Sequence, residues 1–187
     1  VSLFDNYHEW DGAESSFAGV DKRYHAGNDT LIMRDLSREQ VVMRLSGDDL
    51  EIGIKEEGKA FSGLSDVLTI KNWRNPNNRI ETIRFTDGDI TAQNLTGYLT
   101  FGDEGQNFTW TESAADLSLG SGNDTITTGN YGDTVITGSG ANKVFTSGGN
   151  DSIHVSAGAS GSIVQGGAGN DSYSYGRAGG RVSLFDN

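Results

Sequence analysis

Large apolar residues recur at every ninth position through the second half of the chain, and polar or glycine residues fill the spaces between them. The apolar positions are Leu99, Phe108, Leu117, Ile126, Val135, Val144, Ile153, Val164 and Tyr173, with one two-residue insertion at 155–156. Each phrase from residue 119 onward predicts a glycine-rich turn followed by a short strand with one buried side chain. A single phrase cannot bury that side chain alone, so we predict stacked turns of a parallel β-solenoid.

A second column lies two places before the apolar one and is mostly acidic or amide. It contains Asp124, Asp133, Asn142, Asp151, Ser162 and Asp171. The phrases, GGAGNDSYS above all, resemble the haemolysin-type nonapeptide of RTX proteins, G-G-x-G-x-D-x-U-x, where U is a large apolar residue. The resemblance implies a parallel β-roll in which Ca²⁺ lies between turns on the same side, two rows apart.

Calcium prefers about six to eight oxygen ligands, and carboxylates and backbone carbonyls supply them. Pairing rows two apart joins Asp133 to Asp151, Asp151 to Asp171, and Asp124 to Asn142. The predicted metal-binding residues are therefore the column residues and the turn glycines: Gly120, Gly122, Asp124, Gly129, Asp133, Gly138, Gly140, Asn142, Gly148, Gly149, Asp151, Gly166, Gly167, Gly169 and Asp171. The alternative is that Asn, Asp and Gly simply form solvated turns, which they favour in any protein. The earlier rows at Leu99, Phe108 and Leu117 lack the ligand pattern, and we expect them to be metal-poor coils.

The first half has a different pattern. Residues 36–40 have a capping-box form, residues 42–46 and 50–54 flank a turn as a hairpin, and residues 66–70 form a further strand. The run over 27–95 resembles the haemolysin-type calcium-binding-related domain, which implies a small β-rich unit that closes the open end of a roll. We therefore predict an all-β chain with the end of a preceding roll and a loop at 1–35, a capping domain at 36–95 and a β-roll at 96–187.

Composition supports a cation partner and argues against polyanions. The net charge of the chain is −12, so we expect it to repel nucleic acid and anionic membrane surfaces. No apolar run is long enough to span a membrane, so we expect no membrane insertion. Cysteine is absent and 19 of the 27 glycines follow residue 95, which places the domain boundary there. The RTX resemblance implies a secreted protein, exported by type I secretion and stabilised by Ca²⁺ in place of disulfides.

The hexapeptide VSLFDN occurs twice, at 1–6 and 182–187. Such a repeat predicts a tandem array in which copies follow one another head to tail; an engineered duplication is the alternative. Catalytic motifs such as H-E-x-x-H and G-x-S-x-G are missing, so we expect no enzyme activity.

Three functions remain open at this point. The first is a structural module of a large bacterial cell-surface protein, such as an adhesin, surface-layer, sheath or filament unit. The second is a calcium-folded accessory module of an extracellular enzyme. The third is a module that binds cell-surface polysaccharide, suggested by Lys71, Arg74 and Arg79 around Trp73, which equally fit a solvated hairpin face over a packed tryptophan.

Overall fold

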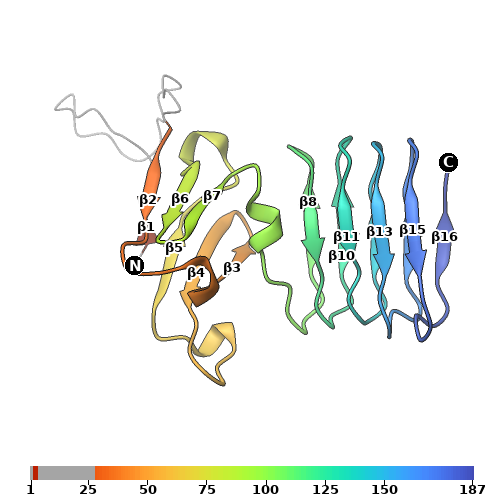
Figure 1. Ribbon diagram of the computed structural model, residues 1–187, viewed down its shortest axis with the longest axis horizontal. Coiled ribbons are helices and arrows are strands. Elements are labelled where there is room, and N and C mark those ends of the chain that lie inside the picture. Colours follow the sequence, from red (N-terminus) through yellow and green to blue (C-terminus); the bar gives the residue numbers. More distant parts are fainter. Residues whose placement is uncertain (1, 4–27) are drawn as a thin grey trace, which may run out of the picture. The chain divides into compact units, whose positions relative to one another are not determined.

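The computed structural model describes residues 2–3 and 28–187 and is all-β apart from short 3₁₀ turns (Figure 1). The chain divides into two compact units, Val1–Ala92 and Gln93–Asn187. The loop predicted between residues 7 and 24 lies outside the described residues. Among the described residues, no helix has the length and apolar character needed to cross a membrane.

The larger sheet of the first unit has the order β1-β5-β4-β3. Strands β3 (Val41–Ser46) and β4 (Asp49–Ile54) form the predicted hairpin, and Gly47 at its tip has φ of 62°. Strand β5 (Val67–Ile70) pairs antiparallel with β4, and β1 (Ser2–Leu3) pairs parallel with β5. The 3₁₀ turns are η1 (Arg38–Gln40), η2 (Phe61–Gly63) and η3 (Pro76–Asn78).

A second sheet in this unit has the order β2-β6-β7, with β2 (Thr30–Ile32), β6 (Thr82–Phe85) and β7 (Gly88–Thr91). We expected residues 1–35 to stand apart as the end of a preceding roll. Instead, β2 pairs parallel with β6 over three residues, and the N–H of Asp29 donates to the Glu81 carboxylate at 2.8 Å. The roll-like phrase at 28–31 therefore forms part of the sheet of the first unit.

Trp73 anchors the core of the first unit. Its side chain is 1% exposed, and its Nε1–H donates to the carbonyl of Ile80 at 3.2 Å. The Arg79 guanidinium lies 4.5 Å from the centre of the Trp73 ring. Lys71 instead pairs with Asp49 at 2.6 Å. The tryptophan is thus packed inside the unit, as expected from the interpretation of this cluster as a solvated hairpin face over a packed tryptophan.

The second unit is a parallel β-roll that follows η4 (Leu95–Tyr98). One sheet has the order β16-β14-β12-β10-β8 and the other β15-β13-β11-β9, and every pairing between roll strands is parallel. In Figure 1 the strands form a ladder of successive rungs. The bounds are β8 (Asn107–Trp110), β9 (Asp116–Ser118), β10 (Thr125–Thr128), β11 (Thr134–Ile136), β12 (Lys143–Phe145), β13 (Ser152–Val155), β14 (Ile163–Gln165), β15 (Ser172–Tyr175) and β16 (Ser183–Phe185).

The apolar column forms the interior of the roll. Ile126, Val135, Val144, Ile153 and Val164 are all fully buried, and each stacks on the apolar residue two rows away in the same sheet. Successive rows alternate between the two sheets because each row turns the chain through half a coil. The predicted parallel β-roll is confirmed. Each row contributes one residue of this column to the interior, and the alternation of the strands buries a second side chain in β8, β10 and β13.

Candidate calcium-binding site

The acidic and amide column splits into two ladders, because neighbouring rows lie on opposite sides of the roll. We call Asp133, Asp151 and Asp171, which precede β11, β13 and β15, the acidic column. In it, each carboxylate Oδ1 accepts the backbone N–H two rows earlier. Asp133 accepts from Ala115 at 2.8 Å, Asp151 from Asp133 at 2.8 Å and Asp171 from Asp151 at 2.9 Å.

The opposite side carries what we call the mixed column, Asp124, Asn142 and Ser162, which precede β10, β12 and β14. The same ladder runs through it. Asp124 Oδ1 accepts from the N–H of Gln106 at 2.9 Å, Asn142 Oδ1 from Asp124 at 2.8 Å and Ser162 Oγ from Asn142 at 2.9 Å. The rows predicted to share a site are therefore neighbours in space, including across the two-residue insertion, where the offset grows from 18 to 20 residues.

The second carboxylate oxygen is the distinctive feature of these columns. Oδ2 of Asp124, Asp151 and Asp171 is buried and accepts no hydrogen bond. A buried carboxylate oxygen without a partner costs several kcal/mol unless a cation neutralises it. Three such oxygens in stacked turns therefore indicate positions for a cation.

Burial also disfavours the charged forms of two of these groups. Desolvation raises the pKa of Asp124 above its ordinary value of 3.8, against the lowering effect of the Gln106 N–H. Desolvation likewise raises the pKa of Asp133, and the nearby charge of Asp151 adds to this. The Asp133 carboxylate accepts hydrogen bonds from the Thr128 hydroxyl and the Ala115 N–H, which lower the pKa in part. Thr128 was not foreseen from the sequence, although its place five residues before the aspartate is a usable signal.

The turn glycines stand where one turn stacks directly on another. A Cβ placed on Gly149, whose φ is 126°, would lie 2.1 Å from the carbonyl oxygen of Tyr131 in the turn two rows earlier. Gly166 differs, because a Cβ there would meet side chains of its own row, the Tyr173 hydroxyl oxygen at 2.0 Å and Oδ2 of Asp171 at 2.4 Å. Similar backbone approaches, between 1.5 and 2.9 Å, occur at Gly120, Gly122, Gly129, Gly138, Gly140, Gly167 and Gly169, whereas Gly148 has a looser contact of 3.3 Å. The glycines thus let the backbone of one turn approach the carbonyl oxygens of the turn stacked on it.

Asn142 has the opposite polarity to the aspartates. Its Nδ2 donates to the carbonyls of Thr137 at 2.7 Å and Ser139 at 3.2 Å, with a longer contact of 3.5 Å to Gly140. The orientation of the amide is fixed, because its Oδ1 must accept from the Asp124 N–H. The amide therefore shows that the carbonyls of a turn converge on its column residue, and here a neutral donor faces them.

These donors fit Ca²⁺. Carboxylate and carbonyl oxygens are the hard ligands that this ion prefers, and the aspartates supply the negative charge. Within the described residues, no group of three Asp, Glu, His or Cys side chains gathers at one point, so backbone oxygens would supply much of the coordination. His154 lies outside this arrangement, with its Nδ1 2.6 Å from the Ser174 hydroxyl oxygen on an exposed position of the roll.

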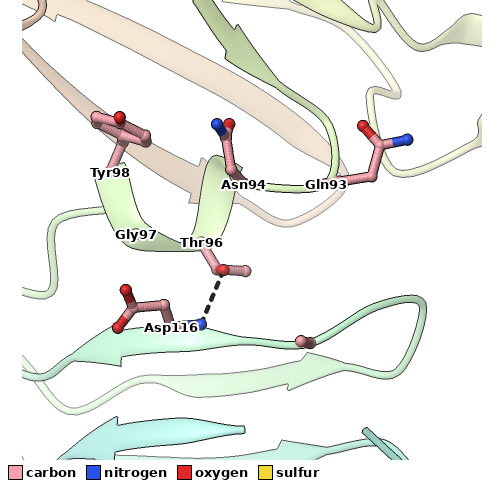
Figure 2. A pocket seen from close by; sticks show the side chains of 7 residues that line it. Gln93, Asn94, Thr96, Gly97, Tyr98 and Asp116 are labelled. Atoms are coloured by element: carbon pink, nitrogen blue, oxygen red, sulfur yellow. Dashed lines mark hydrogen bonds between the residues drawn. The ribbon is translucent and has the colours of Figure 1, made fainter. Parts of the chain in front are cut away.

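A separate pocket of about 430 Å³ opens at the start of the roll and is shown in Figure 2. Its lining residues are Gln93, Asn94, Thr96, Gly97, Tyr98, Ala114 and Asp116. The N–H of Asp116 donates to Oγ1 of Thr96 at 3.0 Å, which ties η4 to β9. Asp116 is the one carboxylate in the lining, and neither histidine nor cysteine accompanies it.

Comparison with protein families agrees with this geometry. Residues 118–153 and 154–178 match the RTX calcium-binding nonapeptide repeat (4 copies), and residues 49–90 match the haemolysin-type calcium binding protein related domain. No curated protein and no solved structure matches the chain. Residues 118–178 of the roll thus match RTX nonapeptide repeats, and such repeats bind Ca²⁺. A β-roll of this kind is typically a calcium-binding structural element, and RTX repeat proteins typically leave the cell by type I secretion.

Proposed function

We propose that this chain is a calcium-stabilised structural repeat module of a large secreted bacterial protein of the cell surface, repeated head to tail. The observation that carries the proposal is the set of buried, unpartnered carboxylate oxygens at Asp124, Asp151 and Asp171, stacked in a parallel roll. A cation bound there joins turns that are distant along the chain. It therefore stiffens the whole roll.

The ligands follow from the repeat itself. The carbonyls that face Asn142 belong to residues five, three and two places before it. The corresponding positions before Asp151 are Thr146, Gly148 and Gly149, and those before Asp171 are Gly166, Ala168 and Gly169. We assign the calcium of the acidic column to these carbonyls and to Asp133, Asp151 and Asp171. When bound, the ion supplies positive charge that the turns otherwise lack.

The mixed column provides fewer calcium sites than the acidic column. Asp124 has a free buried oxygen, whereas Asn142 and Ser162 already donate to turn carbonyls. We therefore place Asp124 in one site and give Asn142 a different role from the ligand that its column position suggests. Its NH₂ group stands in for a cation, so this row of the roll is held without metal.

Three features support the wider setting. RTX repeats are typical of proteins exported by type I secretion, the chain contains no cysteine, and the hexapeptide VSLFDN occurs at an interval of one module. Together they favour an extracellular array stabilised by calcium over a single copy attached to an enzyme. The polysaccharide-binding alternative has less support, because Trp73 is buried and cannot serve as a stacking platform for a sugar.

Limited proteolysis tests the calcium-stabilised module. Lys143 lies in β12, in the middle of the roll, and trypsin cleaves after lysine only where the backbone can unfold locally. We expect cleavage after Lys143 to be blocked in millimolar calcium and rapid in EDTA. Equal cleavage rates in the two conditions would argue against the proposal. Reading the coding sequence on both sides would separate the array, which predicts further copies, from a module attached to a catalytic domain.

A further inference from the structure

Residues of the repeated hexapeptide VSLFDN lie in a strand of each unit, Ser2–Leu3 in the first and Ser183–Phe185 in the second, with a different partner strand in each. In the first copy, Ser2 and Leu3 pair parallel with Thr69 and Ile70 of β5. In the second copy, Ser183, Leu184 and Phe185 pair parallel with Ile163, Val164 and Gln165 of β14. Ser2 and Ser183 occupy the same position in VSLFDN, as do Leu3 and Leu184.

The second copy uses one edge of its strand. The Ser183 N–H donates to the carbonyl of Ser162 at 2.9 Å, and the Phe185 carbonyl accepts from the Gly166 N–H at 3.3 Å. Backbone groups of successive residues in a strand point to opposite edges, so those of Leu184 point away from β14. Within the described part of the chain, β16 is the last strand of its sheet, and Leu184 and Phe185 are about half exposed.

The first copy uses the other edge. The N–H of Ile54 donates to the Asp66 carbonyl, so Asp66 and, by alternation, Leu68 and Ile70 face β4. Thr69 then faces β1. With Thr69 opposite Ser2 in a parallel ladder, the backbone groups that meet it from β1 are those of Leu3, and the groups of Ser2 point away.

The two pairings are therefore complementary on a single strand. The backbone N–H and C=O groups of the serine (Ser2 and Ser183) form hydrogen bonds only with the roll. Those of the leucine (Leu3 and Leu184) form hydrogen bonds only with β5, so no backbone group is used twice. We propose that VSLFDN is one shared strand at each junction of the array. Its serine edge pairs with β14 of one copy, and its leucine edge pairs with β5 of the next copy.

This inference deepens the head-to-tail arrangement of the proposed function and rests on it. Joined in this way, the five-stranded sheet of the roll and the four-stranded sheet β1-β5-β4-β3 become one sheet of eight strands. The register passes from Ile163–Ser183 directly to Ser183–Thr69 of the following copy. The exposed edge of β16 is covered, which removes a template for misassociation, and the partner that fits it is a second copy of this chain.

A two-copy chain, residues 1–181 followed by residues 1–187, tests the shared strand by hydrogen exchange. We expect the amide of the leucine in the junction hexapeptide to exchange at least about tenfold more slowly than that of the C-terminal Leu184 in the same molecule. Flanking residues distinguish the two peptides in mass spectrometry. Equal, rapid exchange at both positions would overturn the proposal.

Two proline substitutions at the junction give a matched pair, since proline removes one backbone N–H. At the junction, Leu184→Pro is expected to speed amide exchange at least about tenfold in β5 of the second copy and to leave exchange in β14 of the first copy unchanged. Ser183→Pro at the junction is expected to speed exchange in β14 of the first copy and to leave β5 of the second copy unchanged. Leu184→Pro at the C-terminus is the control and is expected to alter neither. If both junction variants disturb β14 alone, the strand is not shared.

Calcium titration of the same two-copy chain is a separate readout. Lack of calcium binding would contradict the proposed function, whereas intact binding with an unprotected junction would contradict the shared strand alone.

Discussion

The substitution Asp151→Asn separates the two roles of an acidic-column residue, which are to accept a backbone N–H and to bind a cation. The amide keeps Oδ1, which accepts the N–H of Asp133 at 2.8 Å, but replaces the unpartnered Oδ2 with an NH₂ group. Asn142 shows that this NH₂ can donate to the carbonyls of its own turn. The substitution therefore removes a cation ligand and supplies the neutral donor that the roll already uses elsewhere.

The expected effects have opposite signs in the two conditions. Without metal, removing a buried unpaired charge should raise the free energy of unfolding by about 1–3 kcal/mol. With calcium at about ten times its dissociation constant, each site contributes about 1.4 kcal/mol. Asp151 is assigned to two sites, with Asp133 and with Asp171, so the stabilisation that calcium adds should fall by about 3 kcal/mol.

Urea unfolding followed by circular dichroism, in EDTA and in millimolar calcium, measures both quantities. Asp124→Asn is the matched control, because Asp124 is assigned to one site and should lose about half as much of the calcium increment. Asp151→Ala also removes the acceptor for Asp133 and should be less stable than Asp151→Asn in EDTA by about 1–3 kcal/mol. If Asp151→Asn weakens the roll equally in EDTA and in calcium, its free oxygen is not a cation ligand.

Three further predictions follow from the same geometry. Asn142→Asp should lower stability in EDTA by about 1–3 kcal/mol, because the turn carbonyls lose their donor, and should add calcium dependence visible in the same urea titrations; unchanged calcium dependence would count against it. Gly149→Ala should cost about 2 kcal/mol or more in thermal unfolding, since its φ is 126° and the Tyr131 carbonyl lies 2.1 Å from the new Cβ, whereas Gly102→Ala, with no atom within 4 Å, should stay within about 0.5 kcal/mol. Burial raises the folded-state pKa of Asp124 and Asp133 above 3.8, so the metal-free roll should be most stable below about pH 4 and lose stability as pH rises through the raised values; urea melts in EDTA that show the reverse order would contradict this.

The roll was predictable because its sequence is locally redundant. One apolar residue per row fixes which side chain is buried, and the repeated period fixes the parallel register between Ile126 and Val144 or Val135 and Ile153. The insertion at 155–156 does not disturb this, since Val155 is the last residue of β13, Ser156 follows the strand, and the column resumes at Ser162. The nine-residue period therefore predicted both the β-roll fold and the pairing of its rows.

The first unit was harder to predict because its contacts are non-local. The hairpin β3–β4 follows from alternation and a glycine turn, but the parallel pairing of β2 with β6 joins residues 52 positions apart. No local pattern sets that partner. For the same reason, the sequence suggested a roll-like turn near Asp29, whereas the N–H of Asp29 donates to Glu81 in the sheet of the first unit.

The candidate site shows a similar limit at Asn142. Column position alone predicted an oxygen ligand at Asn142, paired with Asp124. In the structure its Oδ1 accepts the Asp124 N–H and its Nδ2 donates to turn carbonyls, so the different role of Asn142 is our proposal and its role as a ligand stays a prediction. Whether a column residue presents an oxygen or an NH₂ group to its own turn depends on which side-chain atom accepts the backbone N–H two rows earlier. The ladder is visible only when rows are stacked in space.

Calorimetric titration of calcium into the metal-free chain, followed by circular dichroism on the same sample, tests the central claim most directly. We predict binding of several ions with a concurrent gain of β signal and a higher melting temperature, because without a cation the buried carboxylates of Asp124, Asp151 and Asp171 leave the roll only partly folded. Removal of the metal by EDTA should reverse both changes. A chain that shows full β signal and an unchanged melting temperature in EDTA, with no heat of calcium binding, would contradict the account.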